Sequence, residues 1–159
     1  MNIGTLIPRH ARYRADHTAI IFDGERWTYR RFAERVNRLG HALIAAGIGK
    51  GQKVATVVPN CMELLDLYWA VAETGAVVVP MSPLLLPKGL AGLLRDADVE
   101  MVLTHPNYAP LVAAAREHMD IPAGNYIVSG NTSCEGFRAY SDFIADAPAA
   151  PLPDAAITD

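Results

Sequence analysis

The sequence predicts an α/β fold with a parallel-sheet core, flanking helices and an amino-terminal β-hairpin. Residues 54–58, 76–80 and 99–104 are short, Val-rich apolar runs, a composition typical of strands buried on both faces. The stretches between them, 60–74 and 87–97, have helical length. Strands joined through a helix are almost always parallel neighbours with a right-handed crossover. We therefore expect strand, helix, strand, helix and strand to build one parallel sheet.

The chain before this core predicts a short helix, a hairpin and a long helix. Residues 3–14 are expected to form the short helix. Asp23-Gly24 separates two strand-like runs and supplies the positive φ angles that a tight hairpin turn needs. Thr28 is expected to cap a helix that ends near Ala46. Its buried stripe would consist of Phe32, Val36, Leu39 and Leu43.

The first crossover helix of the core carries signals at both of its ends. Asn60 and Glu63 have the spacing of a capping box, in which each side chain bonds a free backbone N–H of the first turn. Gly75 stands where a helix closes in the left-handed conformation. The inward stripe of this helix is expected to be Leu64, Tyr68, Val71 and Gly75.

Three arginines of the long helix, Arg31, Arg35 and Arg38, share one helical face. A nucleic-acid patch is one interpretation of this face. Glu34 interleaves with them, however, and the net charge of the chain is −3. A solvated face is therefore the favoured interpretation.

The chain after Thr104 predicts a helix over 107–119, a strand over 126–128 and a short helix over 137–145. From Pro148 the composition turns to Pro, Ala and Asp, as in a linker. We therefore divide the chain into a structured portion, 1–147, and a linker, 148–159.

Composition and charge exclude several classes of protein. The chain has 159 residues, of which 51% are hydrophobic and 19% charged, as expected for one globular domain. Its net charge of −3 gives no electrostatic case for binding nucleic acid or an anionic membrane. No signal peptide and no transmembrane run is recognisable, so the cytoplasm is the expected compartment.

No residue pattern predicts a catalytic, cofactor-binding or metal site. The glycines of 47–51 could suggest a phosphate loop, but they follow a helix and precede a strand, the reverse of a phosphate cradle. A helix cap and turn is favoured. Cys61 lies at a helix start, which can activate a thiol, yet no Cys or His lies near it in sequence and a structural role is expected. The five histidines are scattered, without ligand spacing: His10, His17, His41, His105 and His118.

The order and spacing of many short pieces resemble the amino-terminal part of AMP-binding, adenylate-forming enzymes, and most of all an acyl-CoA synthetase. The resemblance is firm from about Ala19 to Thr104. Its pieces are Thr28-Tyr29, Arg35-Val36-Asn37-Arg38-Leu39, Ala42-Leu43, Gly47-Ile48, Lys50-Gly51, Val54-Ala55, Pro59-Asn60, Glu63, Ala70, Gly75-Ala76-Val77, Val79-Pro80, Pro83, Leu94, Asp96-Ala97 and Val102-Leu103-Thr104.

Three positions depart from the pattern of that family. Gln52 stands where the family usually has Asp, Ser82 where it has Asn, and Gly89 where a Glu opens the next helix. Gly89 is expected to weaken that helix by about 1 kcal/mol. All three positions are interpreted as structural.

The resemblance implies a parent enzyme that uses ATP and Mg²⁺ to convert a carboxylic acid, here expected to be a fatty acid, to an acyl-adenylate. Coenzyme A then takes the acyl group as a thioester. The family's phosphate loop, adenine-site motif and carboxy-terminal lysine have no counterpart in this sequence. The resemblance therefore implies an amino-terminal scaffold fragment of the larger domain, with no cofactor bound and no activity of its own.

A stand-alone α/β binding or interaction module is the alternative. Any ligand of such a sheet would lie outside the carboxyl ends of the strands, at Pro59-Asn60, Met81-Ser82-Pro83 and His105-Pro106. Caps and turns are the favoured interpretation of these loops. If the chain is instead a fragment cut from a ligase, it would expose apolar surface, and a homo-oligomer or a chain that aggregates readily is expected.

Overall fold

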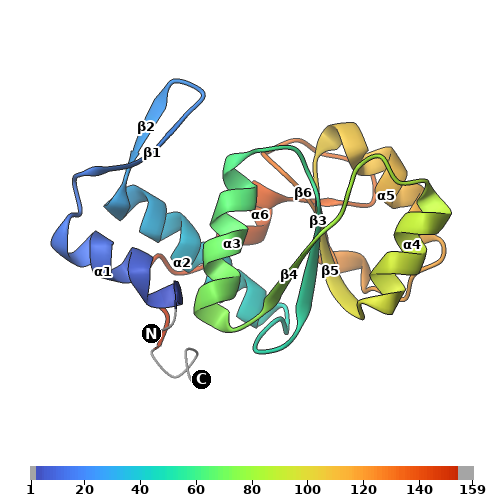
Figure 1. Ribbon diagram of the computed structural model, residues 1–159, viewed down its shortest axis with the longest axis horizontal. Coiled ribbons are helices and arrows are strands. Elements are labelled where there is room, and N and C mark those ends of the chain that lie inside the picture. Colours follow the sequence, from blue (N-terminus) through green and yellow to red (C-terminus); the bar gives the residue numbers. More distant parts are fainter. Residues whose placement is uncertain (1–2, 154–159) are drawn as a thin grey trace.

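The computed structural model describes residues 3–153, and a five-stranded parallel sheet forms their centre (Figure 1). Its strands lie in the order β4-β3-β5-β6-β7, and every neighbouring pair is parallel. The prediction that the three Val-rich runs pair in parallel is confirmed. The strands are β3 (Lys53–Val57), β4 (Val77–Pro80), β5 (Val99–Thr104), β6 (Tyr126–Val128) and β7 (Arg138–Ala139).

Two crossover helices connect the first three strands and lie on opposite faces of the sheet (Figure 1). Helix α3 (Met62–Thr74) leads from β3 to β4 on one side, and α4 (Pro87–Asp96) leads from β4 back past β3 to β5. Because right-handed crossovers in opposite directions place their helices on opposite faces, the sheet is covered on both sides. The direction in which successive strands are added to the sheet reverses between β3 and β5.

Each face of the sheet has its own hydrophobic core. On one face, α2 (Tyr29–Ala45), α3 and α6 (Tyr140–Ile144) enclose a cluster that includes the predicted α2 stripe of Phe32, Val36, Leu39 and Leu43. On the other face, α4 and α5 (Ala109–Arg116) enclose a second cluster around Leu90 and Val112. Short 3-10 turns, η2 (Pro106–Tyr108) and η3 (Ala123–Asn125), flank α5.

The amino-terminal segment packs beside the first core rather than joining the sheet (Figure 1). It consists of η1 (Ile3–Thr5), α1 (Leu6–Tyr13) and the hairpin of β1 (Thr18–Phe22) and β2 (Glu25–Thr28). The hairpin turn has φ angles of 49° at Asp23 and 78° at Gly24, as predicted.

Both ends of α2 form as the sequence predicts. The Thr28 side chain accepts a hydrogen bond from the Arg31 N–H at the start of the helix. At its end, Gly47 has a φ of 82°, and the Ile48 N–H donates to the Leu43 carbonyl at 2.8 Å. The glycine cluster is therefore a helix cap and turn.

The predicted capping box of α3 is wrong. Cys61 occupies the N-cap position without a side-chain cap, and Glu63 instead accepts a hydrogen bond from the Gly130 N–H at 3.1 Å. Gly75 closes the helix with a φ of 73°, as expected.

The predicted inward stripe of α3 is wrong in part: Val71 is buried, but Tyr68 is exposed and Leu64 is only half buried. The buried face is rotated and includes two carboxylic acids, Asp66 and Glu73. Apolar spacing favours a stripe that Leu64 and Tyr68 satisfy, whereas the packing against α2 selects a face that carries acids.

Three expectations about strands and helices need correction. β4 is an edge strand among the described residues, and Val77 is 43% exposed, so it is not buried on both faces. The helix expected over 137–145 begins only at Tyr140, because Arg138 and Ala139 pair with β6. The helix expected over 107–119 ends at Arg116.

The first half of the segment interpreted as a linker lies against α2. The Asn37 side chain donates to the Ala149 carbonyl at 2.8 Å, and Leu152 is buried over Gly40. Residues 154–159 lie outside the described range.

Candidate functional site

The loops after β3, β4 and β5 lie together at the carboxyl edge of the sheet, as the parallel topology requires. The ladder extends one residue past β4 and β5: the Met81 N–H donates to the Thr56 carbonyl at 2.8 Å, and the His105 N–H donates to the Val57 carbonyl at 3.3 Å. The reversal of direction between β3 and β5 makes this edge the place where an open α/β sheet would hold a ligand.

Polar side chains in these loops stabilise their own turns. The Nδ1 atom of His105 accepts a hydrogen bond from the Asn107 N–H at 3.2 Å, which caps η2. The Ser82 hydroxyl accepts from the Leu84 N–H at 3.2 Å. Two of the three predicted loops therefore use their polar groups locally, and whether any of the three contacts a ligand stays a prediction.

A buried polar network lies beneath this edge and joins three helices. Asp66 of α3 has a fully buried carboxylate. Two N–H groups of the Arg35 guanidinium, on α2, donate to it, with Nε 3.0 Å from Oδ2 and 3.2 Å from Oδ1. The Tyr140 hydroxyl, at the start of α6, donates to Oδ2 at 2.8 Å. The network fixes α2, α3 and α6 to one another.

Charge and burial act in opposite directions on the pKa of Asp66. Burial raises the pKa of Asp66, while Arg35 and Tyr140 favour the ionised carboxylate. Burial opposes the charge of Arg35 as well, yet the pKa of Arg35 is raised by Asp66. Burial also raises the pKa of Tyr140, so its hydroxyl stays a donor. The arrangement is a hydrogen-bonded ion pair inside the protein.

The interpretation of the arginine face as solvated is confirmed for Arg31, which is exposed, but it is wrong for the half-buried Arg35 and Arg38. Arg35 is the ion-pair partner of Asp66. Arg31 stacks on Trp27, with its guanidinium carbon 3.7 Å from the ring centre. Arg38 donates to the Ala147 carbonyl at 2.7 Å. No sequence signal links Arg35 to Asp66, because the two residues lie 31 positions apart.

Glu73 is a second buried acid on α3, and no charge partner for it is found within residues 3–153. It is 1% exposed, and its Oε1 atom accepts no hydrogen bond among the described residues. Burial raises the pKa of Glu73 to about 8, so the side chain is a neutral acid at neutral pH. Sequence reasoning missed it, because an acid in an otherwise apolar helix is usually exposed.

Cysteine and metal chemistry find no support in residues 3–153. Burial raises the pKa of the Cys61 thiol to about 11, the opposite of an activated nucleophile, and agrees with the expected structural role. No group of three or more His, Cys, Asp or Glu side chains is arranged to hold a metal ion in this range. Within the same range, no helix has the length and apolarity needed to cross a membrane.

The three positions that depart from the family pattern serve local structure. The Gln52 side chain accepts from the Gly49 N–H at 2.6 Å and donates to Glu100 at 3.1 Å. Ser82 stabilises its own turn, and Gly89 lies in the first turn of α4.

The described residues do not fit a nucleotide and its metal ion. A phosphate site needs several free N–H groups or cations at a strand-to-helix turn. The turn after β3 provides a half-buried, protonated cysteine and the carboxylate of Glu63. We derive no phosphoryl-transfer step from these residues.

Comparison with known proteins identifies a family whose model matches most of this chain. Residues 7–155 match the model of the family described as "AMP-binding enzyme". A long-chain-fatty-acid–CoA ligase of Thermus thermophilus is 35% identical over 121 residues, which are 76% of this chain and 22% of that protein. A crotonobetaine/carnitine–CoA ligase of Salmonella paratyphi B is 28% identical over 72% of this chain and 23% of its own length.

A solved structure gives the same result for the fold. The N-terminal domain of FACL13 from Mycobacterium tuberculosis superposes with a TM-score of 0.77 at 25% identity, over 96% of this chain and 37% of that one. The chain thus spans less than a quarter of the length of the two curated relatives above.

Proposed function

The chain belongs to the AMP-binding enzyme family, and from this premise we propose that it is the amino-terminal scaffold of an ATP-dependent carboxylate–CoA ligase. The observation that carries the proposal is the family match over residues 7–155, together with a sheet whose direction reverses between β3 and β5. In this role the chain supplies the two-faced sheet and the helices packed on it. The chemistry belongs to residues outside this sequence.

The proposed overall reaction has two steps. A carboxylic acid reacts with ATP, assisted by Mg²⁺, to give an acyl-adenylate and pyrophosphate, and coenzyme A then takes the acyl group. We propose a fatty acid as the substrate, which the Thermus relative's name supports. The Salmonella relative is named for a different acid, so the substrate class needs its own measurement. We place the enzyme in the cytoplasm.

The sequence encoded immediately downstream of Asp159 provides the sharpest test. The proposal expects a Ser/Thr/Gly-rich loop ending in Lys within a few dozen codons of that position. The protein that includes this loop should release pyrophosphate with ATP, Mg²⁺ and long-chain acids, and respond less to short or aromatic acids. A stop codon at position 160 would contradict the proposed scaffold role.

A stand-alone α/β binding or interaction module is the second candidate. One observation favours it: within residues 3–153 both faces of the sheet are already covered by the chain's own helices. A module of this kind would be monomeric and would bind its partner without ATP. The same downstream sequence separates the two candidates.

A further inference from the structure

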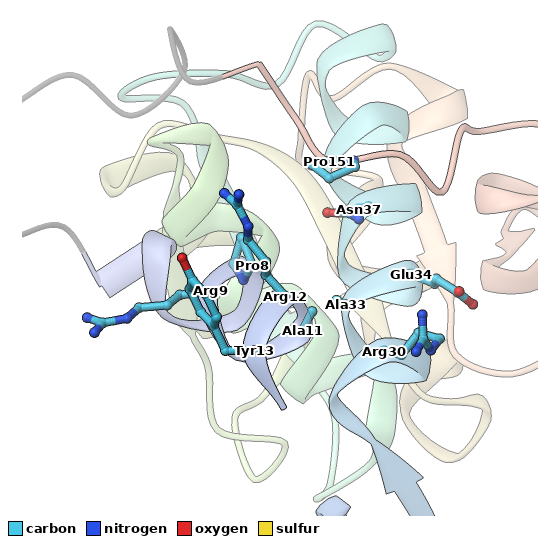
Figure 2. Close-up of a pocket in the computed structure, with 10 residues that line it drawn as sticks. All are labelled: Pro8, Arg9, Ala11, Arg12, Tyr13, Arg30, Ala33, Glu34, Asn37 and Pro151. Atoms are coloured by element: carbon cyan, nitrogen blue, oxygen red, sulfur yellow. The ribbon is translucent and has the colours of Figure 1, made fainter. Parts of the chain in front are cut away.

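A groove of about 850 Å³ runs between α1 and α2, away from the sheet edge (Figure 2). Pro8 and Ala11 of α1 line one side of it, and Ala33 of α2 lines the other. These small apolar side chains form an apolar floor, and Glu34 and Asn37 of α2 add polar groups to the lining. The volume lies within the range of about 300–1,000 Å³ that is usual for small-molecule sites.

Three arginines also line the groove. Arg9 and Arg12 extend from α1, and Arg30 lies across the groove on α2 (Figure 2). Arg30 already pairs with Asp16 at 3.2 Å. Arg12 stacks on the exposed ring of Tyr13, with its guanidinium carbon 5.6 Å from the ring centre. Within residues 3–153, neither Arg9 nor Arg12 has a carboxylate within 4.0 Å, so their positive charge is available to a ligand.

The charge of the groove reflects a division along the whole sequence. Residues 1–50 contain nine Lys or Arg and four Asp or Glu, whereas residues 51–159 contain five and thirteen. The basic charge therefore concentrates in the segment that builds α1, the hairpin and α2. An overall net charge of −3 conceals this division.

We propose that this groove binds the anion of a long-chain carboxylic acid. The apolar floor would take the hydrocarbon chain, because burying it removes apolar surface from water. Arg12 would hold the carboxylate, since a guanidinium group matches its geometry with paired N–H donors, whereas the Arg9 side chain points away from α2 (Figure 2). A small inorganic anion would gain nothing from contact with the apolar floor, and a neutral lipid would form no ion pair with the arginines.

The inference rests on the proposed function for its substrate class, and it locates a second binding site for that substrate away from the carboxyl edge of the sheet. Binding to the chain itself requires neither ATP nor adenylate formation. If the downstream-extended protein makes acyl-adenylates while this groove binds nothing, only the inference fails. If the groove binds but no ligase is encoded, only the proposed function fails.

Calorimetric titration of the purified chain with dodecanoate, below its micelle concentration, tests the proposal. Arg12→Gln removes one guanidinium, and Ala11→Glu places a carboxylate on the apolar floor. Arg26→Gln is the matched control, because it removes the same charge from the exposed hairpin, outside the groove. Dodecanol, acetate and inorganic phosphate are the ligand controls, and circular dichroism verifies that each variant folds.

Saturable binding of dodecanoate at one site is expected. Both groove variants should weaken it about tenfold, the usual size of one charge-assisted contact, while Arg26→Gln changes it less than about twofold. Absence of saturation would overturn the proposal. So would equal binding of dodecanol or phosphate, or an equal loss in the Arg26→Gln control, because the interaction would then be generic.

Discussion

At the scale of single residues, the most consequential feature is Asp66. Its buried carboxylate receives hydrogen bonds from α2 and α6 at once, so three helices depend on one side chain. A buried ion pair adds little net stability by itself, but removing one partner leaves the other unsatisfied. The network therefore specifies how the helices pack more than it strengthens the fold.

Replacing Tyr140 by Phe should lower the free energy of unfolding by about 2 kcal/mol, because it removes a hydrogen bond to a buried carboxylate. Tyr13→Phe is the control, since Tyr13 is 71% exposed. Urea denaturation gives both values. A loss below about 0.5 kcal/mol for Tyr140→Phe would mean that the hydroxyl does not satisfy Asp66 in solution.

Glu73 should make the protein less stable as the pH rises. Burial raises the pKa of Glu73 from 4.5 to about 8, so the folded state keeps a proton that the unfolded chain releases. The stabilisation is complete below about pH 4.5 and is lost between there and about pH 8, by at most about 1.4 kcal/mol per pH unit.

Glu73→Gln should remove this dependence. The variant is expected to match the parent near pH 4.5 and to be the more stable of the two at pH 8. Urea denaturation at pH values across this interval measures the difference. If the two proteins have parallel pH profiles, Glu73 is ionised or solvated in the folded chain.

Sequence reasoning could not find these residues for a physical reason. A charged side chain on an amphipathic helix is exposed in most proteins, and only the tertiary partner reverses that expectation. Arg35 and Asp66 lie on different helices, so spacing within either helix says nothing about their pairing. Turns behave differently: Asp23-Gly24 and Gly47 were predictable because their backbone angles are set locally.

At the scale of elements, composition located β3, β4 and β5, because a buried parallel strand needs a continuous apolar run. Strand order was less accessible. β4 has the composition of an interior strand, yet it lies at the edge of the sheet among the described residues. β7 has only two residues and shows no periodicity, so its sequence is indistinguishable from the start of a helix.

The first turn of α4 is weakly stabilised, and a substitution there should increase the stability of the protein. Its N-cap, Leu86, provides no side-chain cap, and Gly89 lies in the first turn. A Cβ atom at Gly89 would meet nothing within 4 Å. Gly89→Ala should therefore raise the free energy of unfolding by about 0.5–1 kcal/mol.

Gly75→Ala should have the opposite effect on stability, because Gly75 has a φ of 73° and lies close to Lys50. It should lower the free energy of unfolding by about 1 kcal/mol or more. Chemical denaturation of both variants provides the comparison. A destabilised Gly89→Ala protein would show that the start of α4 differs from the structure.

At the scale of the whole molecule, apolar surface remains exposed near the edge strand. Val77 of β4 is 43% exposed, and Leu84 and Leu86 in the following loop are 92% and 77% exposed. Exposed apolar side chains of this size favour association. We therefore predict concentration-dependent self-association of the chain.

The double substitution Leu84→Ser and Leu86→Ser should reduce this association, whereas Ile44→Ser on α2, 45% exposed, should have a smaller effect. Sedimentation velocity over a hundredfold range of concentration measures it. A parent chain that sediments as a monomer throughout would favour the stand-alone module.

The central claim is that this family member provides scaffold rather than chemistry, and pyrophosphate release tests it most directly. The purified chain is incubated with ATP, Mg²⁺ and a panel of carboxylic acids, with an active CoA ligase as the positive control. We predict no release above the rate without protein for any acid. Turnover at about 1 s⁻¹ or faster, a rate ordinary for enzymes, that co-purifies with the chain would contradict the account.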